Sequence, residues 1–342
     1  MAAKKVLVTG ASGFVGGNLV PALVKQGSKV FATSRNRSSD VAIVRLGAEP
    51  VRADLANDSE ADLSETLPQV DWVFHLAGQL SGPPSQLARV NVDGSHKIAS
   101  VCSSWSHSPI FVSLSSVAAG GPSSPEAPKD ETTIPNPISD YGRSKLAGER
   151  IITKYCSAMP ISIVRPGIIF GPGDREFNRL LQSMYRVFLN PLIRGGRQPL
   201  AIIEVADLIR LLIAVAEKGE RVTATTTEGD PARGVGMYYA AALEPISLRQ
   251  LGAIFSSTLR RPVIPLPVIP PVAWILGLLG EQWSVLTKTK STLNRDKIRE
   301  ALAKGWWVDV SKAVSQLNWQ PSRSIEEEMK SWIQRAKDQR LL

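Results

Sequence analysis

The sequence predicts an α/β fold, a doubly wound parallel sheet followed by a smaller, mostly helical C-terminal lobe. In the first half of the 342 residues, short apolar runs alternate with helical patterns. Strands that are apolar on both faces and separated by helices are typical of a parallel sheet covered on both sides. After about residue 170, helical patterns dominate. We therefore expect a sheet domain over residues 1–170, with its sheet completed by later segments, and a second lobe over 171–342.

Each expected strand is a short apolar run. The runs cover residues 5–8, 30–33, a few residues around Val51, 71–76, 110–115 and 161–165. Helical patterns lie between them, chiefly over 18–26, 86–105 and 141–159. In the second lobe, capping-box signatures at Ser247 and Ser324 predict the starts of two helices, the first running toward Leu259. Residues 119–137 are rich in Gly, Pro and Ser and predict a surface loop.

The composition excludes several classes of protein. Two cysteines (Cys102 and Cys156) and three histidines rule out a disulfide framework and argue against a metal site. The formal net charge of +9 is spread along the chain, without a basic run interleaved with aromatic residues. This pattern indicates solubility and some attraction for anions, and we expect no nucleic-acid partner.

No targeting segment is evident. The N-terminal apolar run Val6–Val8 is too short for a signal peptide, so we expect a cytoplasmic protein. The uncharged stretch 262–280 contains five prolines. It is therefore not expected to form one regular helix, nor to cross a membrane.

The first chemical motif is a glycine-rich turn over residues 9–16, directly after the first strand and before a helix. Glycines at positions 10, 13 and 16 allow a tight turn and close approach of a pyrophosphate to the helix N-terminus. This context favours nucleotide binding over a plain tight turn.

The end of the second strand indicates which nucleotide is bound. Ser34-Arg35-Asn36-Arg37 has no acid to accept hydrogen bonds from the ribose hydroxyls of NAD. Arg35, together with Arg37, suits a 2′-phosphate instead, which favours NADP(H) while leaving NAD(H) open. The alternative is that both arginines only face solvent.

A third motif places Tyr141 and Lys145 one helical turn apart, so that both reach one cleft. A cation near the phenol favours phenolate and lets tyrosine exchange a proton with a carbonyl or alcohol oxygen. A surface tyrosine beside a snorkelling lysine is the alternative. Ser115 and Ser116 end the fifth strand, where a hydroxyl can hydrogen-bond a reacting oxygen.

In this combination and order, the motifs resemble those of the extended short-chain dehydrogenases/reductases. That group includes the NAD-dependent epimerase/dehydratases and 3β-hydroxysteroid-dehydrogenase-like enzymes, and the resemblance covers nearly the whole chain. It implies a Rossmann-like sheet. Further segments that resemble family motifs are Ala53–Leu55, His75–Gly78, Asn91–Gly94, Arg165–Gly167, Phe170–Gly173, Asp207 and Trp319–Pro321.

The resemblance implies a role for each matching residue. Tyr141 would be the general acid/base, Lys145 would hold the ribose and depress the pKa of Tyr141, and Ser116 would orient the substrate oxygen, with Ser115 the weaker choice. Asp54 would contact adenine. The implied cofactor-binding set is Gly10, Ser12, Gly13, Phe14, Val15, Gly16, Ser34, Arg35, Asp54, Leu55, Leu76, Ala77, Gly78, Asn91, Tyr141, Lys145, Pro166, Gly167 and Ile168. A homodimer through the helices over 86–105 and 141–159 is also implied.

Two departures bear on the substrate. Enzymes of the family that act on nucleotide sugars often have Asn where this chain has Ile168, and isoleucine has no hydrogen-bond donor for a diphosphate. The missing acid after the second strand also favours NADPH. We therefore expect an NADP(H)-dependent oxidoreductase acting on a carbonyl or secondary alcohol of an apolar small molecule: β-hydroxy or β-oxo, sterol-like, aryl or acyl. A nucleotide-sugar epimerase or dehydratase is the alternative, and a non-catalytic dinucleotide sensor is a further one.

The apolar stretch 266–279 has three interpretations. It fills the core beneath the second lobe, lines an apolar pocket, or rests on a membrane surface beside Lys288, Lys290, Arg295 and Lys297. The core interpretation is favoured and the membrane contact is the least favoured.

Overall fold

A seven-stranded, all-parallel sheet forms the centre of the computed structural model, which describes residues 3–124, 126–174, 176–223, 234–287, 294–339 and 342. The strand order is β10-β6-β5-β4-β1-β2-β3. The strands are β1 (Lys5–Thr9), β2 (Lys29–Ser34), β3 (Glu49–Arg52), β4 (Trp72–His75), β5 (Ile110–Leu114), β6 (Ile161–Pro166) and β10 (Met237–Ala240). The predicted α/β fold is confirmed.

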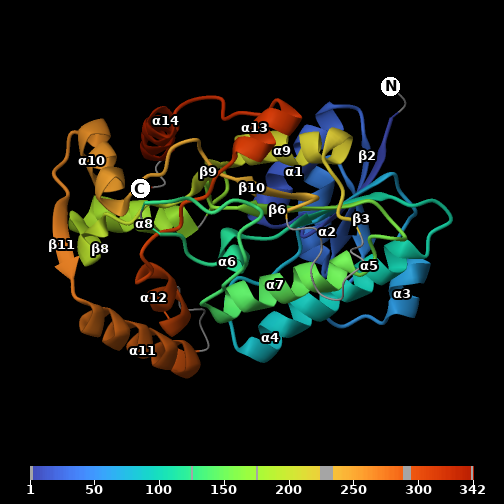
Figure 1. Ribbon diagram of the computed structural model, residues 1–342, viewed down its shortest axis with the longest axis horizontal. Coiled ribbons are helices and arrows are strands. Elements are labelled where there is room, and N and C mark those ends of the chain that lie inside the picture. Colours follow the sequence, from blue (N-terminus) through green and yellow to red (C-terminus); the bar gives the residue numbers. More distant parts are fainter. Residues whose placement is uncertain (1–2, 125, 175, 224–233, 288–293, 340–341) are drawn as a thin grey trace.

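Helices cover both faces of the sheet (Figure 1). One face packs against α1 (Phe14–Lys25), α2 (Arg37–Arg45), α9 (Val205–Lys218) and α13 (Ser311–Leu317). The other face packs against α3 (Glu60–Thr66), α5 (Gly94–Ser103) and α7 (Asp140–Thr153). Because both faces are buried, the central strands consist almost wholly of apolar residues.

Several helix boundaries differ from the expected ones. Helix α1 begins at Phe14, four residues before the predicted start, and α7 ends at Thr153 instead of 159. The stretch 86–105 divides into α4 (Pro84–Ala88), the π-helix η1 (Arg89–Asp93) and α5. The predicted loop over 119–137 begins with the end of a short helix, α6 (Val117–Gly120), and α2 was not predicted. Local propensity is a weak guide where tertiary packing sets a boundary.

In the described part of the second lobe, two small parallel sheets and the helices around them form a separate apolar core. One sheet pairs β7 (Ile168–Phe170) with β9 (Ile202–Glu204), and the other pairs β8 (Leu189–Ile193) with β11 (Ile264–Val268). The helices of this core are α8 (Glu176–Val187), α10 (Leu248–Leu259) and α14 (Ile325–Asp338), and α12 (Arg295–Ala301) lies below them in Figure 1. Capping boxes at Ser247 and Ser324 are present as predicted.

The uncharged stretch 262–280 forms β11 and most of α11 (Pro270–Thr287), so it is not one regular helix, as expected. Its large apolar side chains are mostly exposed, with Ile275 at 55% and Leu279 at 59%. The favoured interpretation, that this stretch fills the core of the lobe, is therefore wrong. Within the described ranges, every helix is too short or too polar to span a bilayer.

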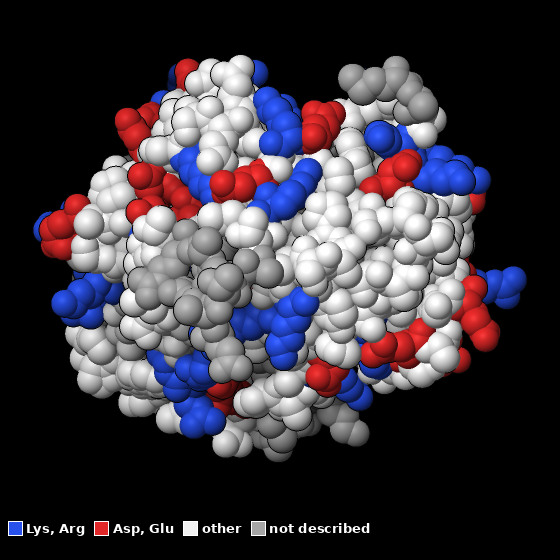
Figure 2. Space-filling view, turned by 45° about the vertical axis from the view of Figure 1, so that its right-hand side comes forward, with Lys and Arg blue, Asp and Glu red and all other residues white. Residues whose placement is uncertain are grey.

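The positive charge is distributed over the molecule. On the face in Figure 2, lysine and arginine side chains are interspersed with aspartate and glutamate. Such mixed surfaces are typical of soluble globular proteins and do not by themselves point to a nucleic-acid partner.

Candidate active site

The glycine-rich turn joins β1 to α1 at the carboxyl edge of the sheet. Gly10 has a φ of +70°, and a Cβ on it would lie 2.8 Å from the amide nitrogen of Ala77. A Cβ on Gly16 would lie 2.5 Å from the Gly10 carbonyl oxygen. Gly13 is the N-cap of α1 and forms no side-chain capping bond. The turn thus requires glycine for its shape and leaves the N-terminus of α1 uncapped by any side chain, as an anion site requires.

The loop after β4 lies directly against this turn. Leu76 and Ala77 contact Gly10, and the Ala77 amide donates to Thr9 Oγ1 over 3.1 Å. Buried His75 joins Thr9 Oγ1 (2.8 Å) to Ser95 Oγ (3.0 Å). Burial, and then the charge of Lys145, lower the pKa of His75 to about 3. The imidazole is therefore neutral and ties β1, β4 and α5 together.

Asn91, on the π-helix η1, connects this loop to α7. Its Oδ1 accepts from the Gln79 amide (2.8 Å), and its Nδ2 donates to the Gln79 carbonyl and to Ser144 Oγ (2.9 and 2.8 Å). A Cβ on Gly78 would contact both Asn91 Oδ1 and Lys145 Nζ. The amide of Asn91 therefore holds the loop in place beside the lysine.

An acid that the sequence pattern did not reveal lies against the end of β2. Buried Ser34 donates its hydroxyl to Asp40 in the first turn of α2, and Asp40 also pairs with Arg52. Arg35 and Arg37 are exposed, and neither guanidinium forms an ion pair or side-chain hydrogen bond with another described residue. The carboxylate is neutralised locally, whereas the Arg35 guanidinium remains available to an anion.

The next loop follows β3. Asp54 accepts from the Ala56 amide (3.0 Å) and from Asn57 Nδ2 (2.8 Å), so its carboxylate shapes its own turn. Leu55 is buried against Gly94 of α5. The Ala53 amide donates to the Ser34 carbonyl (2.9 Å), which fixes this loop beside the end of β2.

Ser116 and Tyr141 meet at the carboxyl end of β5. The Ser116 hydroxyl is close enough to the Tyr141 phenol to favour its ionised form. Ser116 also caps α6 by accepting from the Ala118 amide (3.1 Å). Burial raises the pKa of Tyr141, and Glu300 adds to the rise while the Ser116 hydroxyl opposes it. Burial is the largest of these effects.

Ser115 faces the opposite direction. Its hydroxyl donates to buried Glu149, which forms a two-point ion pair with Arg165 through Nε (2.9 Å) and Nη2 (2.6 Å). All three side chains are buried. Ser115 thus belongs to a structural network beneath α7, and Ser116 is the serine that faces the tyrosine.

Lys145 lies one turn after Tyr141 on α7. Its ammonium donates to the Leu114 carbonyl over 2.7 Å. Burial lowers the pKa of Lys145 to about 8, although the Glu149 carboxylate opposes the shift. The amine therefore lies between the ends of β4 and β5, beside Gly78.

Helix α12 reaches α7 from the second lobe, a contact without any sequence signal. Asp296 accepts from the amides of Asp140 (2.8 Å) and Tyr141 (3.2 Å), so it caps α7 from outside. Lys297 Nζ lies 5.6 Å from the Tyr141 ring centroid and 2.9 Å from Glu300 Oε2. The other oxygen of Glu300 is buried without a hydrogen-bond partner.

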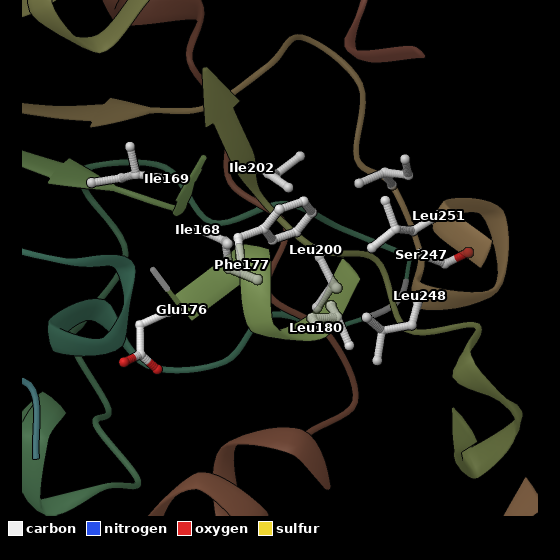
Figure 3. Close-up of a pocket in the computed structure, with 11 residues that line it drawn as sticks. Ile168, Ile169, Glu176, Phe177, Leu180, Leu200, Ile202, Ser247, Leu248 and Leu251 are labelled. Atoms are coloured by element: carbon white, nitrogen blue, oxygen red, sulfur yellow. The ribbon is translucent and has the colours of Figure 1, made fainter. Parts of the chain in front are cut away.

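An apolar cavity of about 220 Å³ lies in the second lobe, beginning at the residues that follow Pro166–Gly167 (Figure 3). Glu176 and Ser247 are its polar lining residues, and Figure 3 shows their oxygens directed away from the apolar side chains. The apolar lining residues are Ile168, Ile169, Phe177, Leu180, Leu200, Ile202, Ile246, Leu248 and Leu251. The expected pocket lining over 266–279 contributes nothing to this cavity.

Comparison with known proteins identifies the family. The model of the "NAD dependent epimerase/dehydratase family" matches residues 6–226. The chain belongs to this family. Sterol-4-alpha-carboxylate 3-dehydrogenase, decarboxylating, of Dictyostelium discoideum is 26% identical over 86% of this chain and 94% of that protein. Ceramide reductase of Caulobacter vibrioides is 29% identical over 88% and 85%. UDP-glucuronic acid 4-epimerase from Bacillus cereus, solved with NAD, has a TM-score of 0.73 at 21% identity, covering 98% and 99% of the two chains.

Membership of the epimerase/dehydratase family assigns the chain to the NAD(P)-dependent enzymes of the short-chain dehydrogenase/reductase type. The glycine turn fits such a dinucleotide, because a Cβ at Gly10 or Gly16 would fill the space that the turn needs. Exposed Ser12 and Gly13, with half-buried Phe14 and Val15, form the rim of this turn. Met1 and Ala2, and the Lys288 and Lys290 that the sequence placed beside 266–279, lie outside the described residues.

Proposed function

We propose that the protein is an NADP(H)-dependent oxidoreductase that interconverts a carbonyl and a secondary alcohol on a largely apolar substrate. The observation that carries the proposal is the apolar cavity that begins at Ile168, directly after Pro166–Gly167. Ile168 pairs with Ile202 in the β7–β9 sheet, and both line the cavity. Such a largely apolar lining suits an alkyl, aryl or sterol-like body, and Ile168 has no side-chain donor for a diphosphate.

In this proposal, each residue at the carboxyl edge of the sheet binds a different part of the cofactor. The glycine turn and the N-terminus of α1 hold the pyrophosphate, and Arg35 receives the 2′-phosphate. Lys145 holds the ribose, and Asp54 and Leu55 lie by the adenine. NADP(H), when bound, supplies or accepts the hydride.

Tyr141 and Ser116 handle the proton and the reacting oxygen. In reduction, the phenol of Tyr141 donates a proton to the carbonyl oxygen, and in oxidation the phenolate removes the alcohol proton. Ser116, whose hydroxyl lies beside the phenol, orients the same oxygen. The positive charge of Lys145 favours the phenolate while the proton is away.

Two relatives support an apolar carbonyl substrate. The curated names sterol-4-alpha-carboxylate 3-dehydrogenase and ceramide reductase both denote oxidation or reduction of lipid-like molecules. The structural neighbour that acts on UDP-glucuronic acid favours the alternative, a nucleotide-sugar epimerase. Its identity of 21% supports the fold and leaves the substrate open.

The test is a turnover assay with NADPH and, separately, NADH. Apolar ketones, β-oxo acids and acyl thioesters are followed by cofactor absorbance, and nucleotide sugars by product analysis. Net oxidation of NADPH with a ketone, lost in Tyr141→Phe, supports the proposal. Conversion of a nucleotide sugar without net cofactor change would overturn it. If Tyr141→Phe retains the full function of the wild type, the protein is instead a non-catalytic dinucleotide sensor.

A further inference from the structure

The strand–helix unit of β11 and α11 exposes a large apolar surface, which we call the β11–α11 face. It contributes eight of the fifteen large apolar side chains that are exposed among the described residues. They are Ile264, Leu266, Ile269, Val272, Ile275, Leu276, Leu278 and Leu279. Strand and helix follow each other along the outer edge of the second lobe (Figure 1). An apolar concentration of this kind marks an interaction surface.

Helix α11 is apolar on the side that faces away from the protein. Its inner side holds Ala273 and Gly277, and a Cβ on Gly277 would lie 2.8 Å from Ile298 of α12. The outer stripe holds Val272, Ile275, Leu276 and Leu279, at the helical spacing of one face. Helices on the surface of a soluble domain place polar residues outward, and a helix that is apolar on all sides is covered by protein or lipid.

The exposed strand is unsuited to a partner that adds a strand. Pro265 and Pro267 alternate along β11 and have no N–H to donate. Prolines on an edge strand block pairing with another chain. Whatever covers this face therefore contacts side chains and not the backbone.

The surroundings of the face are basic. Segments 177–203 and 245–280, which hold α8 after its first residue Glu176, β8, α10, β11 and the start of α11, contain no Asp or Glu. Arg186 is exposed in the last turn of α8, before β8, and Arg260 is exposed at the C-cap of α10, before β11. Arg194 is exposed directly after β8. Arg261 is held beside them by stacking 4.4 Å from the Tyr185 ring centroid. Acidic surfaces are therefore attracted here, and basic ones are repelled.

Two cations that the sequence analysis placed beside the stretch do not contribute. Arg295 pairs with Glu281 over 2.6 Å, and Lys297 pairs with Glu300 over 2.9 Å. The available positive charge is thus at the arginines around β8 and β11.

We propose that the β11–α11 face rests on the surface of an anionic lipid membrane. The apolar stripe of α11 would enter the boundary between headgroups and acyl chains, and the arginines would contact the lipid phosphates. The helix would lie in the membrane plane. No helix in the described residues is long and apolar enough to cross a membrane. This inference goes beyond the proposed function and does not require it.

Vesicle flotation of the purified full-length protein tests the inference, using phosphatidylcholine alone and phosphatidylcholine mixed with phosphatidylglycerol. The informative variant is Ile275→Gln/Leu279→Gln, and the matched control is Val41→Gln/Val44→Gln on α2. The two valines are 49% and 59% exposed, against 55% and 59% for the pair on α11. Thermal melting verifies that each variant is folded, and Tyr141→Phe separates lipid binding from catalysis.

We expect the wild type, Tyr141→Phe and the Val41/Val44 variant to float equally well with the anionic vesicles. The Ile275/Leu279 variant should bind these vesicles at least about tenfold more weakly. Arg260→Gln should weaken binding to the anionic vesicles about fivefold. The proposal is overturned if the wild type does not float, if it floats equally with both lipids, or if the Ile275/Leu279 variant floats as well as the wild type. A wild-type oligomer that this variant converts to a monomer, without vesicle binding, would assign the face to a second copy of the chain.

Discussion

The ammonium of Lys297 lies 5.6 Å from the ring centroid of Tyr141, although the two residues belong to helices far apart in the sequence. Its partner Glu300 adds to the rise in the pKa of Tyr141 that burial causes. Asp296, on the same helix, caps α7 at the tyrosine itself. Helix α12 therefore sets both the position and the charge environment of the proposed acid/base.

Replacing Glu300 by Gln should lower the pKa of Tyr141, because the substitution removes a negative charge that disfavours phenolate. The chain has five tyrosines, so ¹³C NMR of labelled tyrosine can follow each phenol, with Tyr141→Phe for assignment. Glu326→Gln, at an exposed position on α14, is the control and should leave the titration unchanged. A rise in the Tyr141 pKa would contradict the assignment.

Replacing Ser116 should reduce kcat, whereas replacing Ser115 should reduce the free energy of unfolding. Ser116→Ala should reduce kcat about 100-fold, because the hydroxyl that orients the reacting oxygen is removed. Ser115→Ala should instead reduce the free energy of unfolding by about 1–3 kcal/mol, since it removes a hydrogen bond from buried Glu149. Steady-state kinetics and urea denaturation of both variants measure the contrast. A larger kcat loss in Ser115→Ala would reverse the two roles.

Arg35→Ala should weaken NADPH binding about 10- to 100-fold and leave NADH binding nearly unchanged, because one charge-assisted hydrogen bond to the 2′-phosphate is lost. Isothermal titration with each nucleotide measures this. Arg45→Ala, at the exposed far end of α2, is the matched control. Equal weakening for both nucleotides would remove Arg35 from the phosphate site.

Asp174 should make stability depend on pH. Its carboxylate accepts from the amides of Glu176 (2.9 Å) and Phe177 (3.0 Å), but burial raises its pKa to about 6. The folded state thus binds the proton more tightly than the unfolded state. This contribution to the free energy of unfolding is therefore present below about pH 4 and lost as the pH rises toward 6.

Asp174→Asn removes this pH dependence. Two pKa units correspond to about 3 kcal/mol, and one lost hydrogen bond offsets about 1 kcal/mol. We expect the variant to be about 2 kcal/mol more stable than the wild type above pH 6, with the difference shrinking toward pH 4. Urea denaturation across this range checks the sign, and a constant difference would show that Asp174 does not titrate there.

Local sequence patterns were sufficient to predict the central sheet and the residues along its carboxyl edge. Apolar runs separated by helices predict parallel strands, and Gly10, Tyr141 and Lys145 stand at spacings that local chain geometry dictates. The proline-rich stretch 262–280 was also predicted not to form one regular helix, since proline removes a backbone donor wherever it occurs. Boundaries such as the start of α1 were missed, because the glycine turn passes directly into the helix.

Contacts between segments far apart in the sequence could be identified only from the tertiary structure. No local pattern in the sequence predicts that Asp40 contacts Ser34 and Arg52. No local pattern shows which of the two adjacent serines, Ser115 or Ser116, faces Tyr141. The apolar stretch 266–279 has the composition of a core segment, yet its side chains face outward because α12 covers only one side of α11. The sequence by itself determined the sheet and the order of its motifs, which depend on the hydrogen bonding and apolar periodicity of neighbouring residues. Only the tertiary structure decided which side chains surround Tyr141 and which apolar surface stays exposed, because these depend on how separate elements pack.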